Sequence, residues 1–240
     1  MSTFSELYRE IFENNNLTKF ISDDNIRKFE ALTSEMLRVN EFMNLTAIKD
    51  TADIIAKHYA DSLVIADMIS ENAYVIDVGT GAGFPTLPLA IVRPDISITA
   101  LDSTAKKLNY ISDTAKLLKL DNISILHSRA EEAGQSEYRE SFDFVCARAV
   151  ASLNVLCEYC LPFIKIGGKC LAMKSLSADT ELDNSLTAIE KLGGEMTGNI
   201  PLNLYTPNGT QKRNVIIIQK KRSTPKIYPR NNAQINKNPL

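Results

Sequence analysis

Three glycines at alternate positions follow an apolar run, and they constrain the fold more than any other feature of this chain. The run at residues 74–78 predicts a buried strand. Pro85 predicts the start of a helix, because its missing N–H would have no partner there. Gly79, Gly81 and Gly83 lie between them, and glycines let a chain turn sharply and let a ligand approach the main chain. In an open α/β sheet this turn lies at the carboxyl end of a strand, where such sheets bind ligands.

The spacing of the glycines excludes two common nucleotide-binding loops. A dinucleotide-binding turn requires Gly-x-Gly-x-x-Gly, and its third glycine would fall on Phe84 or Thr86. A Walker A loop needs a lysine after its glycines, and no lysine occurs between Lys57 and Lys106. The pattern Asp-x-Gly-x-Gly-x-Gly, which begins at Asp77, resembles instead motif I of Class I S-adenosylmethionine-dependent methyltransferases.

Two features further along the chain agree with that resemblance. The next predicted strand is followed by Asp102, and a carboxylate at this place can accept both hydroxyls of a ribose. The segment Arg129-Ala130-Glu131 follows the third predicted strand, where such folds place adenine contacts. Together with the glycine turn, these features favour an S-adenosylmethionine site.

Apolar periodicity predicts an α/β protein with three parts. Residues 1–70 form an N-terminal helical extension, residues 71–222 an α/β core that the resemblance of its glycine turn identifies as a Rossmann-like methyltransferase core, and residues 223–240 a basic C-terminal tail or an extended arm lying on the body. Within the core, Val- and Ile-rich strands alternate with helices, which favours a parallel sheet covered on both faces. The predicted strands are residues 74–78, 97–101, 123–126, 142–147, 169–173 and 215–219. The predicted helices between them are residues 85–92, 105–118, 153–163 and 180–192.

The charge of the chain is distributed unevenly. Its 27 Lys and Arg against 29 Asp and Glu give a net charge of −2, yet no Asp or Glu follows Glu195. The residues after Glu195 carry eight positive charges, which leaves 19 positive against 29 negative, or −10, before them. A basic segment on an acidic body favours contact with a polyanion, although a solvated tail would have the same composition.

Two of the four cysteines, Cys157 and Cys160, have the spacing of a metal-ligand pair. No second close pair follows, and the only histidines are His58 and His127, whereas a zinc site needs four well-placed ligands. The pair also has the i, i+3 spacing of a helix face, so we expect buried free thiols and no metal. Free thiols fit a reducing setting, and the chain shows neither a signal peptide nor a membrane span. We therefore expect a cytoplasmic protein.

The stretch after the fourth predicted strand bears on the methyl acceptor. It reads Cys146-Ala147-Arg148-Ala149, without the Pro-Pro-aromatic turn that orients an exocyclic amine. Cytosine-C5 methylation needs a cysteine nucleophile, usually in a Pro-Cys or Thr-Cys pair, and neither pair occurs. A ring nitrogen such as guanine N7 already has a free lone pair, so it needs alignment and no general base. The sequence agrees with N7 attack without proving it.

Short motifs along nearly the whole chain resemble the glucose-inhibited division protein B family, also called the ribosomal RNA small-subunit methyltransferase G family. Their order and spacing make the resemblance specific. The matching motifs are Asn44-Leu45-Thr46, His58-x-x-Asp61-Ser62-Leu63, Asp77 to Pro85, Arg93-Pro94-Asp95, Asp102-Ser103 with Lys106-Lys107, Arg129-Ala130-Glu131, Arg148-Ala149, Pro162 with Gly167-Gly168, Lys174, and Tyr228-Pro229-Arg230.

The resemblance implies methyl transfer from S-adenosylmethionine to N7 of a guanosine in the decoding-region loop of 16S rRNA. The substrate would be this RNA or the assembling small subunit, and the enzyme a monomer. The expected cofactor-binding residues are Asp77, Gly79, Gly81, Gly83, Phe84, Asp102, Ser103, Thr104, Ala130, Glu131 and Arg148. Arg148 is also expected to position the reactants, and the expected RNA-binding residues are Asn44, Lys174, Lys226 and Arg230.

Several alternatives remain open. The chain could be a Class I methyltransferase for a protein or a small molecule, or a nucleotide-binding regulator without catalysis. Arg148 could be ion-paired to Asp77 or Asp143, and Asn44 could serve only a turn. The sequence also departs from the family pattern: Thr86 stands where the family usually has glycine after Phe-Pro. Four further departures are Val39 for tryptophan, Ser175 for glycine, Ala233 for glycine and Ile235 for proline.

Overall fold

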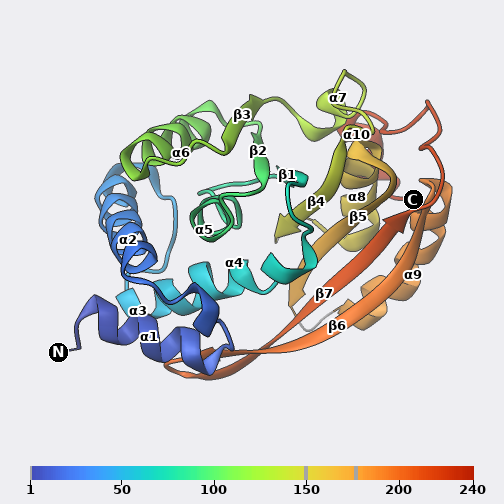
Figure 1. Ribbon diagram of the computed structural model, residues 1–240. Coiled ribbons are helices and arrows are strands. Elements are labelled where there is room, and N and C mark those ends of the chain that lie inside the picture. The colour runs from blue at the N-terminus through green and yellow to red at the C-terminus, as the bar shows by residue number, and fades with distance from the viewer. Residues whose placement is uncertain (1, 149–150, 176–177) are drawn as a thin grey trace.

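A computed structural model describes residues 2–148, 151–175 and 178–240 of the chain, so Ala149 of the Arg148-Ala149 motif lies outside the described residues. One sheet of seven strands runs through the molecule in the order β3-β2-β1-β4-β5-β7-β6 (Figure 1). The strands are β1 Tyr74–Val78, β2 Ser97–Asp102, β3 Ile123–His127, β4 Phe142–Arg148, β5 Ile164–Ser175, β6 Gly194–Thr206 and β7 Gly209–Lys220.

Helices cover both faces of this sheet, as the alternation of strands and helices predicted. Apolar side chains of α5 and α6 pack on one face, together with the N-terminal helices, and those of α8, α9 and α10 pack on the other. The helices that follow β1 in the chain are α5 Thr86–Val92, α6 Ala105–Leu118, α7 Ala130–Ala133, α8 Leu153–Cys160, α9 Ala178–Lys191 and α10 Asn232–Lys237. Alternate residues of a strand point to opposite faces, so Val75 joins the first core and Ile76 the second.

The prediction of an entirely parallel sheet is wrong at one end. Strands β3, β2, β1, β4 and β5 pair in parallel, but β7 pairs antiparallel with both β5 and β6. Strand β6 was not predicted either; its side chains alternate between exposed and partly buried, and it contains Gly198 and Pro201. Both residue types weaken a strand pattern. Only Pro207 and Asn208 separate β6 from β7, and so short a connection can join only antiparallel strands.

The N-terminal helices share one hydrophobic core with the sheet. They are α1 Phe4–Asn14, α2 Asp23–Met43, α3 Thr51–Ile54 and α4 Asp61–Leu63, with a π-helical turn at Ile55–Ala60 between the last two. The stacked rings of Tyr8 and Phe12 contact Phe29, which in turn contacts Tyr59. The helical stretch of residues 51–63 is not one regular α-helix. Its π-helical turn is a feature frequent at functional sites.

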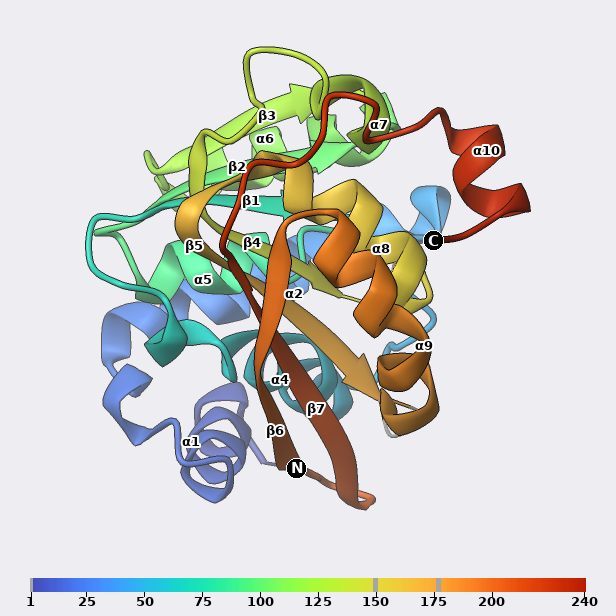
Figure 2. The same ribbon diagram turned by 90° about the vertical axis from the view of Figure 1, so that its right-hand side faces the viewer.

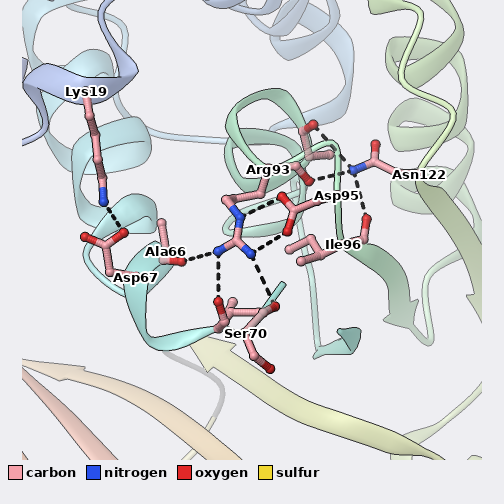
Figure 3. A network of polar contacts seen from close by, with 10 residues as sticks. Lys19, Ala66, Asp67, Ser70, Arg93, Asp95, Ile96 and Asn122 are labelled. Atoms are coloured by element: carbon pink, nitrogen blue, oxygen red, sulfur yellow. Dashed lines mark hydrogen bonds and ion pairs between the residues drawn. The ribbon is translucent and has the colours of Figure 1, made fainter. Parts of the chain in front are cut away.

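Arg93 ties the N-terminal helices to the sheet (Figure 3). Its guanidinium donates to the carbonyl oxygens of Ala66, Ile69 and Ser70 at 2.6, 2.9 and 3.2 Å, and to both oxygens of Asp95 at 2.7 and 2.6 Å. The chain leaves the helical extension at these carbonyls, just before β1. Arg93 thus fixes the entry to β1 against the loop that leads into β2.

The C-terminal segment, residues 223–240, lies on the body of the protein, which is one of the two arrangements that the sequence left open (Figure 2). Arg139 donates to the carbonyl oxygens of Thr224, Pro225 and Tyr228. Arg230 forms an ion pair with the fully buried Glu158 of α8, with N–O distances of 2.8 and 2.6 Å. Beyond this point α10 packs against α8. None of the helices in the described residues combines the length and apolar character needed to cross a membrane.

We predict that Arg93→Ala lowers the free energy of unfolding by about 3 kcal/mol, because three carbonyls and a carboxylate lose a charged donor. Urea unfolding would measure this change. Arg9→Ala is the control, since Arg9 pairs with Asp23 through exposed side chains and its loss should cost less than about 0.5 kcal/mol. Equal losses in the two variants would contradict the role given to Arg93.

Candidate functional site

The glycine turn folds back on the end of β2. The backbone N–H groups of Gly79 and Thr80 both donate to the carbonyl oxygen of Leu101, at 2.9 and 3.0 Å. The φ angles of Gly79, Gly81 and Gly83 are +73°, +59° and +87°, a left-handed region that other residues rarely adopt. At Gly83 an added Cβ would also lie 2.6 Å from the Leu87 side chain. Gly83 is buried and serves the packing of α5 against the turn.

Asp102 joins this turn to the loop after β2. Its Oδ2 accepts from the N–H of Gly81 at 3.0 Å, and its Oδ1 accepts from the N–H of Thr104 at 2.8 Å. The residue is 8% exposed. Each carboxylate oxygen has a second lone pair, so Asp102 keeps the capacity to accept two hydroxyls after these bonds are made.

Asp77 lies beneath the turn and does not line the cleft, although it was expected to bind the cofactor directly. It is fully buried, and Oδ2 accepts a hydrogen bond of 2.7 Å from the hydroxyl of Thr86. Burial raises the pKa of Asp77, and the hydroxyls of Thr86 and Thr80 oppose that rise. The departure at Thr86 is thereby accommodated, because a glycine would leave this oxygen without its hydroxyl partner.

An open cleft of about 990 Å³ lies beside the turn and gathers most of the predicted site residues. Its walls come from the π-helical turn, the loop after β2 and the ends of β4, β5 and β7. The predicted residues that line it are Gly79, Gly81, Phe84, Asp102, Ser103, Thr104, Arg148 and Lys174. Lys174 also donates to the carbonyl oxygen of Ala151.

A smaller pocket of about 170 Å³ adjoins the cleft and includes two of the residues that were expected to contact adenine. Ala130 and Glu131 line it, together with Gly79, Asp102 and Ser103, which line both cavities. Three expected RNA-binding residues line neither cavity. Asn44 ends α2 in a left-handed conformation, with φ of +50°, and Lys226 and Arg230 lie on the C-terminal segment.

Arg148 lies at the end of β4, inside the cleft, and its ion-pair partner is Asp61. One guanidinium nitrogen donates to Asp61 Oδ2 at 3.2 Å and to the carbonyl oxygen of Lys57 at 2.9 Å. The other oxygen of Asp61 accepts from Arg213 of β7 at 3.0 Å. The alternative that Arg148 pairs with Asp77 or Asp143 is therefore wrong. The motif His58-x-x-Asp61-Ser62-Leu63 was the available sequence signal for Asp61, and Arg213 had none.

Comparison with known proteins decides the family. The sequence profile of the family described as GidB, rRNA small subunit methyltransferase G, matches residues 25–202. This chain belongs to that family. It is 47% identical over 222 residues to "Ribosomal RNA small subunit methyltransferase G" of Acetivibrio thermocellus, which covers 92% of this chain and 90% of that protein. It is 40% identical to the protein of the same name from Bacillus cereus, over 98% of both chains. The resemblance inferred from short motifs is confirmed.

Solved structures confirm the fold class. TYW2 from M. jannaschii in complex with AdoMet superposes with a TM-score of 0.54 at 18% identity, over 67% of this chain and 74% of that one. A SAM-dependent O-methyltransferase from Thermotoga maritima gives 0.53 at 17% identity, over 81% and 72%. At such low identity these likenesses show the fold alone. It is the Class I methyltransferase fold, with N-terminal helices added.

His58 belongs to the site without having been assigned to it. Its ring stacks on Phe84, with 4.5 Å between ring centroids and 3° between planes. Its Nε2 lies 2.8 Å from the hydroxyl of Thr46, whose backbone is held in turn by the amide of Asn40. Burial, with Arg148 and Lys57 nearby, lowers the pKa of His58 to about 4. The ring is therefore neutral at pH 7 and extends the aromatic wall of the cleft.

No group of three metal-ligating side chains, which would be the minimum for a metal site, occurs among the described residues. The four cysteines are buried free thiols. Cys157 and Cys160 lie on α8 and pack in the core, as their spacing predicted, and burial raises the pKa of both thiols well above the usual value.

We predict that stability falls as pH drops from about 6.5 to about 4, in part because of His58. Above pH 6.5 His58 is neutral in both states, but below it the unfolded chain binds a proton that the folded chain does not. The loss should reach at most about 3 kcal/mol near pH 4.

Urea unfolding of the parent protein and of His58→Gln across this pH range would measure the effect. The substitution should flatten the profile, while His127→Gln, at an exposed position, should not. A profile unchanged by His58→Gln would show that other groups cause the pH dependence.

Proposed function

We propose that this chain transfers a methyl group from S-adenosylmethionine to N7 of a guanosine in the decoding-region loop of 16S rRNA. The observation that carries the proposal is the meeting of two cavities at Gly79, Asp102 and Ser103. A carboxylate stands at their junction, a guanidinium lies in the larger cavity and a small pocket opens beside it. This arrangement has the chemistry needed for a ribose, an amino-acid carboxylate and an adenine.

Each part of the cofactor has a matching group. Asp102 would accept the ribose hydroxyls, and Arg148 would pair with the cofactor carboxylate, since a guanidinium is a strong donor to such a group. Ala130 and Glu131 would border the adenine. Gly79 and Gly81 carry no side chain, so the cofactor can approach the main chain closely there. When bound, S-adenosylmethionine supplies an electrophilic methyl group.

The titratable groups of the cleft support attack by an atom that needs no general base. Asp61 accepts from two arginines, and Asp102 accepts from two backbone N–H groups. His58 is neutral, stacked on Phe84 and bonded to Thr46. Guanine N7 presents a free lone pair, so orientation of the two reactants is the protein's task.

Cations at the cleft favour a polyanionic acceptor over a neutral small molecule. Lys57, Lys107 and Arg213 line the cleft together with Lys174, and RNA phosphates attract such side chains. The proposed partner is 16S rRNA or the assembling small subunit, met by a cytoplasmic monomer. The names of the relatives, which specify ribosomal RNA and the small subunit, support the same acceptor.

The test is methyl transfer from labelled cofactor to naked 16S rRNA and to small subunits lacking the modification. Digestion to nucleosides and mapping of the label should give one N7-methylguanosine in the decoding region. Label in a different base, or in protein, would overturn the proposed acceptor. Cofactor binding without methyl transfer to either substrate would favour the alternative of a nucleotide-binding regulator without catalysis.

We predict that Arg148→Ala lowers methyl transfer by tenfold or more while the protein stays folded. A charged hydrogen bond contributes about 1.5–3 kcal/mol, and 1.36 kcal/mol corresponds to a factor of ten in rate. Lys165→Ala is the control, because Lys165 pairs with Asp143 away from the cleft. If the melting temperature of Arg148→Ala collapses and the folded fraction keeps full turnover, Arg148 is structural.

The RNA contact proposed for the C-terminal segment falls mainly on Lys226 and Lys237. Both side chains are exposed, whereas Arg230 is held by Glu158. Replacing both lysines with alanine should weaken RNA binding and change the log–log slope against salt by about 1.4 at most, at about 0.7 per phosphate. Filter binding at several salt concentrations would measure it. Arg9→Ala with Arg27→Ala removes the same charge from α1 and α2, and an equal change there would remove the segment from the RNA-binding surface.

A further inference from the structure

The wall of the small pocket comes from four places in the chain. Val78 ends β1 and Gly79 follows it, Asp102 ends β2 and Ser103 follows it, and residues 128–131 follow β3. The fourth part comes from Tyr159 of α8 and Asn232 of α10. The first three lie at the carboxyl ends of parallel strands, as the fold requires. The fourth depends on the C-terminal segment returning across α8 (Figure 2).

Hydrogen bonds fix how the side chain of Asn232 is oriented. Asn236 Nδ2 donates to the backbone carbonyl oxygen of Asn232 at 2.8 Å, so this atom of Asn236 is a nitrogen. The same nitrogen lies 2.7 Å from the side chain of Asn232, and the Tyr159 hydroxyl lies 2.6 Å from the same atom. That atom of Asn232 must therefore be the oxygen, Oδ1, which accepts from both.

The other end of the amide has no such partner. Within the described residues, Asn232 Nδ2 makes no hydrogen bond, although the residue lines the pocket and is only partly exposed. A fixed amide donor beside a cavity is suited to a ligand that offers acceptors. Adenine offers ring nitrogens as acceptors and a flat face to the neighbouring walls.

We propose that the C-terminal segment completes the adenine end of the cofactor site, with Asn232 Nδ2 donating to a ring nitrogen of the base. This inference rests on the proposed function, since it takes S-adenosylmethionine as the ligand. A cavity of roughly 150 Å³ holds a benzene ring, so a pocket of about 170 Å³ open on one side suits one aromatic base. The ribose would then lie at Asp102, which borders both cavities.

Contacts on both sides of Asn232 hold the C-terminal segment in place beside the pocket. Glu158, next to Tyr159 on α8, accepts from the backbone N–H and from the guanidinium of Arg230 at 2.6–2.8 Å. Ile235 of α10 is fully buried in the core beneath. Asn232 is therefore fixed on both sides along the chain. Residues expected from their charge to serve RNA alone would also shape the cofactor pocket.

The test is Asn232→Asp, which is isosteric and keeps one oxygen for Tyr159 and Asn236 while it replaces the free donor by an acceptor. Calorimetry would use two ligands that share the base, S-adenosylhomocysteine and 5′-methylthioadenosine. We expect Asn232→Asp to weaken the binding of both ligands by the same factor, roughly tenfold or more. Arg148→Ala should weaken the binding of S-adenosylhomocysteine far more than the binding of 5′-methylthioadenosine, because 5′-methylthioadenosine lacks the carboxylate.

Asn238→Asp is the matched control. It makes the same chemical change at an exposed position just after α10 that lines neither cavity, and both affinities should stay unchanged. Should Asn232→Asp fail to fold, Asn232→Ala gives the same comparison without the added charge. Parent-like affinity for both ligands in a folded Asn232 variant would overturn the inference. Failure of the parent protein to bind S-adenosylhomocysteine would instead overturn the proposed function.

Discussion

The carboxylate of Asp61 holds the cleft together. It is 7% exposed and accepts from Arg148 at the end of β4 and from Arg213 near the start of β7. Burying one carboxylate is costly, and two guanidinium groups offset that cost only because each donates directly to a different oxygen. Asp61 reaches this place because the π-helical turn before it shifts the helix by one residue relative to a regular α-helix. The N-terminal helices are thereby joined to both halves of the sheet at the candidate site.

Local sequence signals predicted the part of the fold that pairs in parallel. Residues 74–78 form β1 within the predicted bounds, and the helix predicted for residues 105–118 is α6. These elements follow from apolar periodicity. Strand β6 was not predicted because one of its faces is partly solvated and because Gly198 and Pro201 interrupt its apolar pattern. Its stability comes from pairing along β7, a partner that no local pattern reveals.

The candidate site shows the same division. The glycine turn and Asp102 were predictable because each follows a strand, and parallel strands bring their carboxyl ends to one edge. The partner of Arg148 was not, since Asp61 lies 87 residues earlier, in a helix whose π-helical turn depends on packing. The place of Asn232 in the small pocket could not be predicted from the sequence for a similar reason. Its segment reads as a basic tail, and contacts with residues distant in sequence, such as the ion pair of Arg230 with the buried Glu158 of α8, hold that segment beside the pocket.

Both ends of the chain therefore converge on one site from opposite sides. The N-terminal part supplies His58, which stacks on Phe84 of the glycine turn, and Asp61. The C-terminal part supplies Asn232 on the far side of Asp102. A Class I sheet alone fixes only the strand ends, which recur in many enzymes of unrelated specificity. Residues that distinguish this site from others of the fold should thus lie in the two terminal segments, and the same segments carry the cations that we propose contact RNA. Recognition of the acceptor and of the cofactor would then depend on the same few anchoring contacts.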